Sequence, residues 1–96
     1  MTQDQAVAAE REVTIINERG LHARASAKFV TLVAEYDADV TVIKDDMDVP
    51  GASIMSLLML AAGPGSTLTI KATGPQAQAA VDALVTLVED RFGEER

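Results

Sequence analysis

A single histidine lies close to three cations in a chain that is otherwise acidic. The 96 residues carry eight Lys and Arg against fifteen Asp and Glu, which gives a formal net charge of −7. From Arg19 to Ala34, however, there are three cations and no carboxylate, and His22 lies inside this stretch. An imidazole has an ordinary pKa of about 6.5, so near neutral pH its unprotonated nitrogen can act as a nucleophile. The pattern favours a nucleophile that reacts with an anionic group.

The residues after His22 predict a helix that begins at the histidine and ends near Tyr36. Apolar residues recur at helical spacing at Phe29, Leu32, Val33 and Tyr36. The first turn of a helix presents unpaired N–H groups and the positive end of the helix dipole, and both bind anions. Arg24 adds a guanidinium suited to phosphate. We predict that His22 accepts a phosphoryl group and that Arg24 stabilises it, although a lone histidine beside a glycine is often only a helix cap or a surface residue.

The elements around this helix are expected in the order β-α-β-β-α-β-α. Leu68, Ile70 and Ala72 alternate with polar residues, as in a half-buried antiparallel strand. A stripe of small residues on the first helix, at Ala23, Ala27, Val30 and Ala34, is expected to approach the sheet. An α+β structure follows, in which helices cover one face of an antiparallel sheet. The expected strands are residues 13–17, 40–44, 47–49 and 67–73, and the helices are residues 22–36, 53–61 and a last one that begins at Gly74-Pro75.

The second helix is apolar around nearly its whole circumference between Ile54 and Leu60. A two-turn helix on a sheet can bury only part of that surface, and we expect Leu57 and Leu60 to face the core. Exposed apolar residues that include methionine are typical of a protein-binding surface, although core packing is the alternative. Ser53 is expected to cap the helix through its hydroxyl oxygen. The residues expected to be partly exposed are Ile54, Met55 and Leu58.

Composition excludes several kinds of site. The chain has no cysteine, hence no disulfide or thiolate chemistry, and its one histidine excludes a multi-histidine metal centre, so we expect no metal. The acidic charge argues against nucleic acid, and the longest apolar run, residues 54–62, is too short to span a membrane. We expect a cytoplasmic monomer with one domain at residues 12–93, a disordered tail at 1–11 and a solvated tail at 94–96.

Two motifs resemble one known family. The string Gly20-Leu-His-Ala-Arg-Ala-Ser-Ala27 is similar to the active-site signature of HPr, the histidine-containing phosphocarrier of the phosphoenolpyruvate-dependent phosphotransferase system. The string Pro50-Gly-Ala-Ser-Ile-Met-Ser-Leu-Leu58 resembles the regulatory Lys-Ser-Ile-Met-Gly segment of that family. The resemblance covers about Val13 to Phe92. It departs from the family pattern at three positions: Ala25 replaces proline, Ala52 replaces lysine and Ser56 replaces glycine.

The resemblance implies an open-faced β-sandwich with a four-stranded antiparallel sheet and three helices on one face. It implies that His22 takes a phosphoryl group from enzyme I, assisted by Arg24, and passes it to an EIIA-type acceptor, without a cofactor and without enzymatic turnover of its own. It further implies that an HPr kinase/phosphorylase modifies Ser53. The partner-binding residues that we expect are Ile54, Met55, Leu58, Ala27 and Lys28.

Other functions fit parts of the pattern. A regulatory domain that senses a small ligand could share the β-α-β layout, but it would not explain the cations around His22. An acyl carrier is also small and acidic, but it would be all-helical, which the strand-like runs contradict. Within the phosphocarrier interpretation, a sugar-transport branch and a nitrogen-type regulatory branch both remain open, with a weak preference for the regulatory one because of Ala25 and Ala52.

Overall fold

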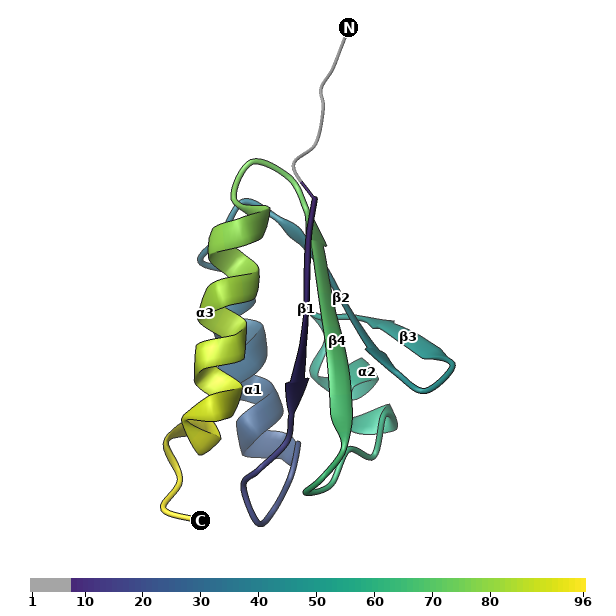
Figure 1. Ribbon diagram of the computed structural model, residues 1–96, viewed down its shortest axis with the longest axis vertical. Helices are drawn as coiled ribbons and strands as arrows, with labels where there is room; N and C mark the ends of the chain where they lie inside the picture. The colour runs from purple at the N-terminus through teal and green to yellow at the C-terminus, as the bar shows by residue number, and fades with distance from the viewer. Residues whose placement is uncertain (1–7) are drawn as a thin grey trace, which may run out of the picture.

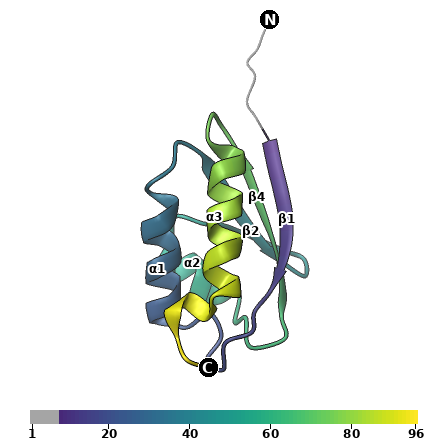
Figure 2. The same cartoon turned by 60° about the vertical axis from the view of Figure 1, so that its left-hand side comes forward.

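Within residues 8–96, which the computed structural model describes, four antiparallel strands form one sheet in the order β1-β4-β2-β3. Three helices lie on one face of this sheet (Figures 1 and 2). The predicted α+β architecture and its element order are therefore confirmed. The elements are β1 (Ala8–Thr14), α1 (Ala23–Val33), β2 (Asp39–Lys44), β3 (Met47–Pro50), α2 (Ile54–Met59), β4 (Thr67–Thr73), α3 (Ala77–Glu89) and a 3₁₀ turn, η1 (Arg91–Gly93).

The first strand begins and ends earlier than predicted. β1 pairs with β4 from Ala8 opposite Thr73 to Thr14 opposite Thr67. Residues 8–11, which we expected in a disordered tail, therefore belong to the sheet, and the rest of that tail lies outside the described residues. The sequence hides this strand because only Ala9 and Val13 face the core while its other side chains are exposed. Backbone pairing, rather than an apolar pattern, extends it.

The core lies between the sheet and the helices. Leu68, Ile70 and Ala72 of β4 are buried, as their alternation predicts. On α1 the predicted stripe of small residues is wrong, because the buried face consists of Ala25, Ser26, Phe29 and Val33. The helix begins at Ala23, and its packing follows the spacing 25, 29 and 33. The small residues on the true face, Ala25 and Ser26, allow the start of α1 to pack closely.

Helix α2 divides its apolar residues between the core and solvent, as predicted. Leu57 is fully buried, whereas Met55 is 71% exposed. Ser53 caps the helix, because the Ser56 N–H donates to Ser53 Oγ at 3.2 Å. Met59, which the prediction did not include, is 67% exposed and adds to the same surface. We refer to the exposed apolar residues of this helix as the α2 patch, and they are Ile54, Met55, Leu58 and Met59.

After α3 the chain makes a left-handed turn over three consecutive residues. Arg91, Phe92 and Gly93 have φ of 56°, 54° and 78°. Phe92 is fully buried, and its carbonyl accepts a hydrogen bond of 2.6 Å from Lys28 Nζ on α1. This turn brings the C-terminal residues beside the β1–α1 connection (Figure 2). The predicted solvated tail at 94–96 is therefore wrong for Glu94, which is held against the domain.

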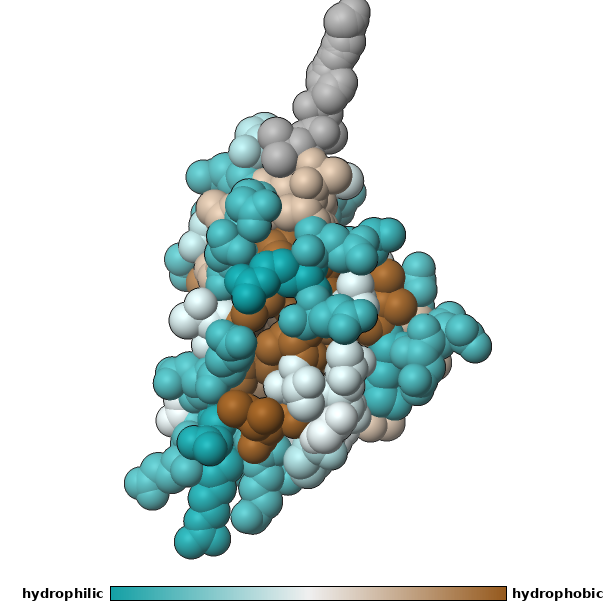
Figure 3. Space-filling model, in the orientation of Figure 1, coloured by the Kyte–Doolittle hydropathy of each residue, from teal (hydrophilic) through white to brown (hydrophobic). Residues whose placement is uncertain are grey.

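The surface reflects the acidic composition. In the orientation of Figure 1 it is largely hydrophilic, with apolar side chains visible between polar and charged ones (Figure 3). Among the helices of residues 8–96, none has the length and the apolar character needed to cross a bilayer.

Candidate functional site

His22 is the N-cap residue of α1. Its backbone is extended, with φ −76° and ψ −178°, and its carbonyl accepts the Ser26 N–H at 2.8 Å, the first hydrogen bond of the helix. Its ring nitrogen Nδ1 accepts the Arg24 N–H at 3.2 Å, so the imidazole performs the role that serine or aspartate usually has at this position. The side chain is 16% exposed. The ring is thus fixed at the positive end of a helix and remains accessible to solvent.

The turn before His22 depends on Gly20. Its φ is +66°, and a Cβ at this position would lie 2.5 Å from the Ala62 carbonyl oxygen. Because these two segments of the backbone approach so closely, the Leu21 N–H can donate to the same Ala62 carbonyl oxygen at 2.8 Å. Glycine is therefore required here for both conformation and space. The contact also joins the residue before His22 to the loop that follows α2.

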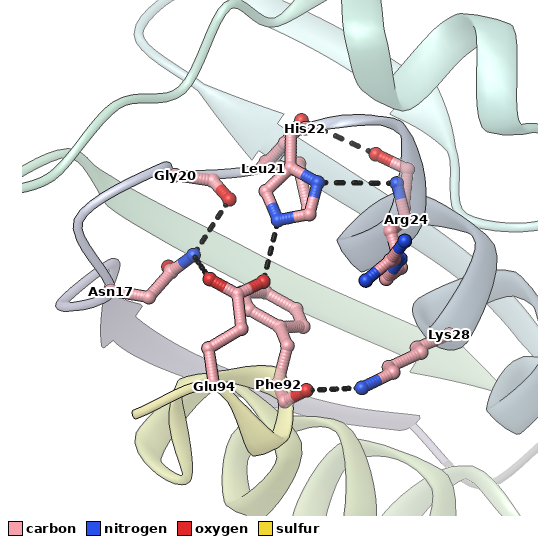
Figure 4. Close-up of polar contacts among 9 residues, drawn as sticks. Asn17, Gly20, Leu21, His22, Arg24, Lys28, Phe92 and Glu94 are labelled. Carbon is pink, nitrogen blue, oxygen red and sulfur yellow. Dashed lines mark hydrogen bonds and ion pairs between the residues drawn. The ribbon is translucent and has the colours of Figure 1, made fainter. Parts of the chain in front are cut away.

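A carboxylate lies against the other ring nitrogen. His22 Nε2 is 2.5 Å from Glu94 Oε2, and the Glu94 side chain is only 20% exposed (Figure 4). The second oxygen, Oε1, accepts a hydrogen bond of 3.1 Å from Asn17 Nδ2, which also donates to the Gly20 carbonyl at 2.9 Å. Asn17 is fully buried. The site therefore joins the turn before α1 to the C-terminal segment.

The surroundings of Glu94 favour its ionised form. The hydrogen bond from His22 holds the pKa of Glu94 below its usual value, and the hydrogen bond from Asn17 and the charges of His22 and Arg19 act in the same direction. Partial burial opposes the shift but does not reverse it. The sequence showed His22 in a stretch without carboxylates, and the fold brings one to it.

The predicted cations differ in their contacts. The Arg24 side chain is exposed beside His22 in the first turn of α1, and it forms no hydrogen bond or ion pair with any other of residues 8–96 (Figure 4). Lys28, one turn further along α1, instead donates to the Phe92 carbonyl and holds the C-terminal turn.

The remaining predicted residues lie on two helices that contact each other. Ala27 is half-buried on α1, and the α2 patch lies on the neighbouring helix. The hydrogen bond between Leu21 and Ala62 joins the residue before His22 to the loop that follows α2, whereas Ser53 lies at the beginning of that helix. Within residues 8–96, no group of three His, Cys, Asp or Glu residues could hold a metal ion.

Sequence reasoning missed two residues of the site, Asn17 and Glu94. Asn17 was the last residue of the expected strand at 13–17, three positions before Gly20, and nothing in that position indicated a buried anchor. Glu94 contacts a residue 72 positions away, and the charged C-terminal sequence gave no signal of this contact. The fold and the site together describe a small α+β domain that presents an imidazole at the N-terminus of a helix, beside an exposed arginine.

Comparison with known proteins identifies the family of this domain. A sequence model described as the PTS HPr component phosphorylation site matches residues 9–90. The chain belongs to this family, the HPr phosphocarriers of the phosphotransferase system. The phosphocarrier protein HPr of Cupriavidus necator is 48% identical over 85 residues, which are 88% of this chain and 96% of that protein. The phosphocarrier protein NPr of Shewanella violacea is 45% identical, over 88% of this chain and 93% of that protein.

Solved structures agree with this assignment. HPr-C-His from Thermoanaerobacter tengcongensis superposes with a TM-score of 0.88 at 36% identity, covering 92% of this chain and 99% of that one. An HPr dimer from the same organism gives 0.72 at 37% identity, covering 88% and 99%. The resemblance of the two motifs to the HPr family is thereby confirmed, and with it the open-faced sandwich.

Proposed function

We propose that His22 accepts a phosphoryl group from enzyme I, which phosphoenolpyruvate phosphorylates, and passes it to an EIIA-type protein. A ring nitrogen of His22 bonds to phosphorus while the bond from phosphorus to the donor breaks, and the donor keeps that electron pair. In the second transfer a nucleophile of the acceptor bonds to phosphorus while the bond from phosphorus to the His22 nitrogen breaks, and the ring keeps that electron pair. The observation that carries the proposal is the imidazole at the N-terminus of α1 beside the Arg24 side chain, which forms no ion pair or hydrogen bond with other residues of the described range 8–96.

The first turn of α1 would receive the phosphoryl group. Its backbone N–H groups and dipole favour the dianionic oxygens, and a guanidinium can bind two of them at once. The Arg24 N–H, which now donates to Nδ1, can turn to a phosphoryl oxygen once that nitrogen has reacted. The protein supplies no further catalytic group in this proposal, so turnover requires the partner enzymes.

The partner surface in this proposal consists of the α2 patch with Ala27 and Lys28. A contiguous patch of exposed apolar side chains such as Met55 and Met59 is typical of an interaction surface, and methionine adapts to different partners. Enzyme I and the acceptor would use this surface in turn, and in this proposal the protein acts as a monomer in the cytoplasm. Because relatives named HPr and NPr are nearly equally similar, both a sugar-transport EIIA and a nitrogen-type EIIA should be assayed as acceptors.

Ser53 is the proposed regulatory site for an HPr kinase/phosphorylase. A phosphate there would add about −1.5 to −2 charges next to the α2 patch and would weaken docking to acidic partner surfaces. The half-buried Ser53 hydroxyl already accepts the Ser56 N–H at 3.2 Å, so phosphorylation of this oxygen would alter the hydrogen bond that caps α2. Incubation of Ser53→Ala and wild type with the kinase and ATP tests this, and equal labelling of both would contradict it.

The test of the main proposal is incubation with phosphoenolpyruvate and enzyme I. We expect one phosphoryl group on the wild type, labile in acid and stable in alkali, and none on His22→Ala. Ser53→Ala is the matched control and should be labelled as the wild type is. Label that persists in His22→Ala, or a wild type that enzyme I does not phosphorylate, would refute the assignment.

A further inference from the structure

The three methionines of residues 8–96, which are Met47, Met55 and Met59, are all exposed, and the last two belong to the α2 patch. We propose that Met55 and Met59 are sites of reversible oxidation by hydrogen peroxide and that their conversion to methionine sulfoxide weakens the docking of partner proteins on this patch. The proposal rests on the proposed function, in which partners dock there, whereas the oxidation can be measured without any partner.

Methionine is absent from the core of the described residues. The buried apolar side chains of residues 8–96 are those of alanine, valine, leucine, isoleucine and phenylalanine. Met55 and Met59 are instead the most exposed large apolar side chains of this range, and Met47 is 44% exposed. The sequence has no cysteine, and its fourth methionine, Met1, lies outside the described residues. The three exposed thioethers are therefore the groups of residues 8–96 most open to a mild two-electron oxidant.

The two methionines of the α2 patch are neighbours on the helix. Met55 and Met59 are four residues apart, so their side chains lie on one face, one turn from each other. Leu57 and Leu60, which are buried, attach α2 to the core. Oxidation at the exposed face therefore requires no unfolding and leaves the packing of α2 unchanged, so its effect is confined to the surface that a partner would meet.

The reaction needs only the peroxide. A lone pair of the thioether sulfur bonds to one oxygen of hydrogen peroxide while the O–O bond breaks, and the second oxygen leaves with that electron pair. It takes the proton of the first oxygen, so the products are the sulfoxide and water. Sulfur is oxidised by two electrons and the peroxide is reduced by two. Methionine sulfoxide reductases reverse the change, and two of their thiols are oxidised to a disulfide as water is released.

Oxidation would change the surface without changing its charge. The sulfoxide oxygen is polar and hydrated, and burying it against a partner without a hydrogen-bond donor costs free energy. Two of the four residues of the α2 patch would lose their apolar character in this way. We expect the KM of enzyme I for the oxidised protein to rise roughly tenfold or more, which is the effect of losing one buried apolar side chain at an interface. His22 caps α1 and is not modified, so kcat should change little.

The first measurement locates the oxidation. The protein is treated with hydrogen peroxide, the peroxide is removed with catalase, and the peptides are analysed by mass spectrometry. We expect one added oxygen on Met55 and one on Met59, both removed again by methionine sulfoxide reductases, and a thermal unfolding curve that matches the untreated protein. Methionines of the α2 patch that stay reduced under conditions that oxidise free methionine would overturn the proposal, as would sulfoxides that the reductases do not remove.

The second measurement is the KM of enzyme I for the treated protein, with the peroxide removed beforehand so that enzyme I is not exposed to it. The double variant Met55→Leu, Met59→Leu keeps apolar side chains of similar size, and each protein is compared with its own untreated form. Peroxide should raise the KM for the wild type and for Met47→Leu, the matched control outside the α2 patch, but not for the double variant.

Two outcomes of this measurement would overturn the proposal. One is an unchanged KM for a wild type that carries both sulfoxides, and the other is a double variant as sensitive to peroxide as the wild type. If the untreated wild type accepts no phosphoryl group from enzyme I, the proposed function fails, and the effect on docking fails with it. The two kinds of failure are distinguishable because the untreated protein is assayed first.

Discussion

Asn17→Ala is the variant that tests how the site is held together. The substitution removes two hydrogen bonds of Nδ2, one to the Gly20 carbonyl at 2.9 Å and one to Glu94 at 3.1 Å. A buried carbonyl left without a partner costs about 1–3 kcal/mol, and the partly exposed bond to the carboxylate contributes about 1 kcal/mol or less. Asn17 Oδ1 is itself buried without a partner among the described residues, so its removal recovers part of this loss. We expect a net loss of about 2 kcal/mol.

For a domain of this size, a loss of that magnitude lowers Tm by roughly 10–15 °C. Urea and thermal unfolding followed by circular dichroism measure both values. Asn17→Asp is the matched control, because it keeps the shape but places a second carboxylate beside Glu94. Its destabilisation should be larger at neutral pH, where both groups are ionised, than in acid. A stability of Asn17→Ala within about 0.5 kcal/mol of the wild type would refute the view that this side chain anchors the site.

Three further outcomes follow from the structure. Arg24→Ala should fold with wild-type stability but accept phosphate from enzyme I roughly tenfold more slowly, because a charge-assisted contact is lost; a wild-type rate would make Arg24 merely a surface charge. Gly20→Ala should lower the free energy of unfolding, measured by urea titration, by about 2 kcal/mol or more, because its φ is +66° and the new Cβ would lie 2.5 Å from the Ala62 carbonyl oxygen. Gly63→Ala is the control, because a Cβ there would meet open space, and it should change the free energy of unfolding little. Because folding lowers the pKa of Glu94, its ionised form stabilises the protein fully above about pH 4.5, and this contribution disappears as the pH falls through the lowered value. The stability difference between wild type and Glu94→Gln should therefore be present at pH 7 and shrink in strong acid, and a difference that does not depend on pH would contradict the pairing.

The sequence could predict the parts of the fold that depend on local residue patterns. The alternation of Leu68, Ile70 and Ala72 indicated β4, and the spacing of Phe29 and Val33 indicated α1, because strand and helix periods repeat over a few residues. The division of the apolar residues of α2 between the core and solvent could be predicted from geometry alone, because so short a helix cannot bury all of them.

The parts that sequence could not predict depend on contacts between distant segments. Residues 8–11 belong to β1 because β4 lies beside them, not because of their own composition. Arg91 and Phe92 adopt left-handed backbone without the glycine or asparagine that usually indicates it, so the turn that directs Glu94 to His22 had no local signature. The acidic end of a chain is typical of a solvated tail, and only tertiary structure shows that one of its carboxylates completes the site.

The position of the C-terminal turn has a practical consequence. Whatever is attached beyond Arg96, whether an affinity label, a fluorophore or a surface for immobilisation, emerges next to the imidazole and can pull the final turn away from it. Strand β1 begins at the opposite end of the long axis (Figure 1). Fusions made on that side leave the surroundings of His22 unobstructed, and binding studies that compare the two attachment points would reveal how much the last few residues contribute.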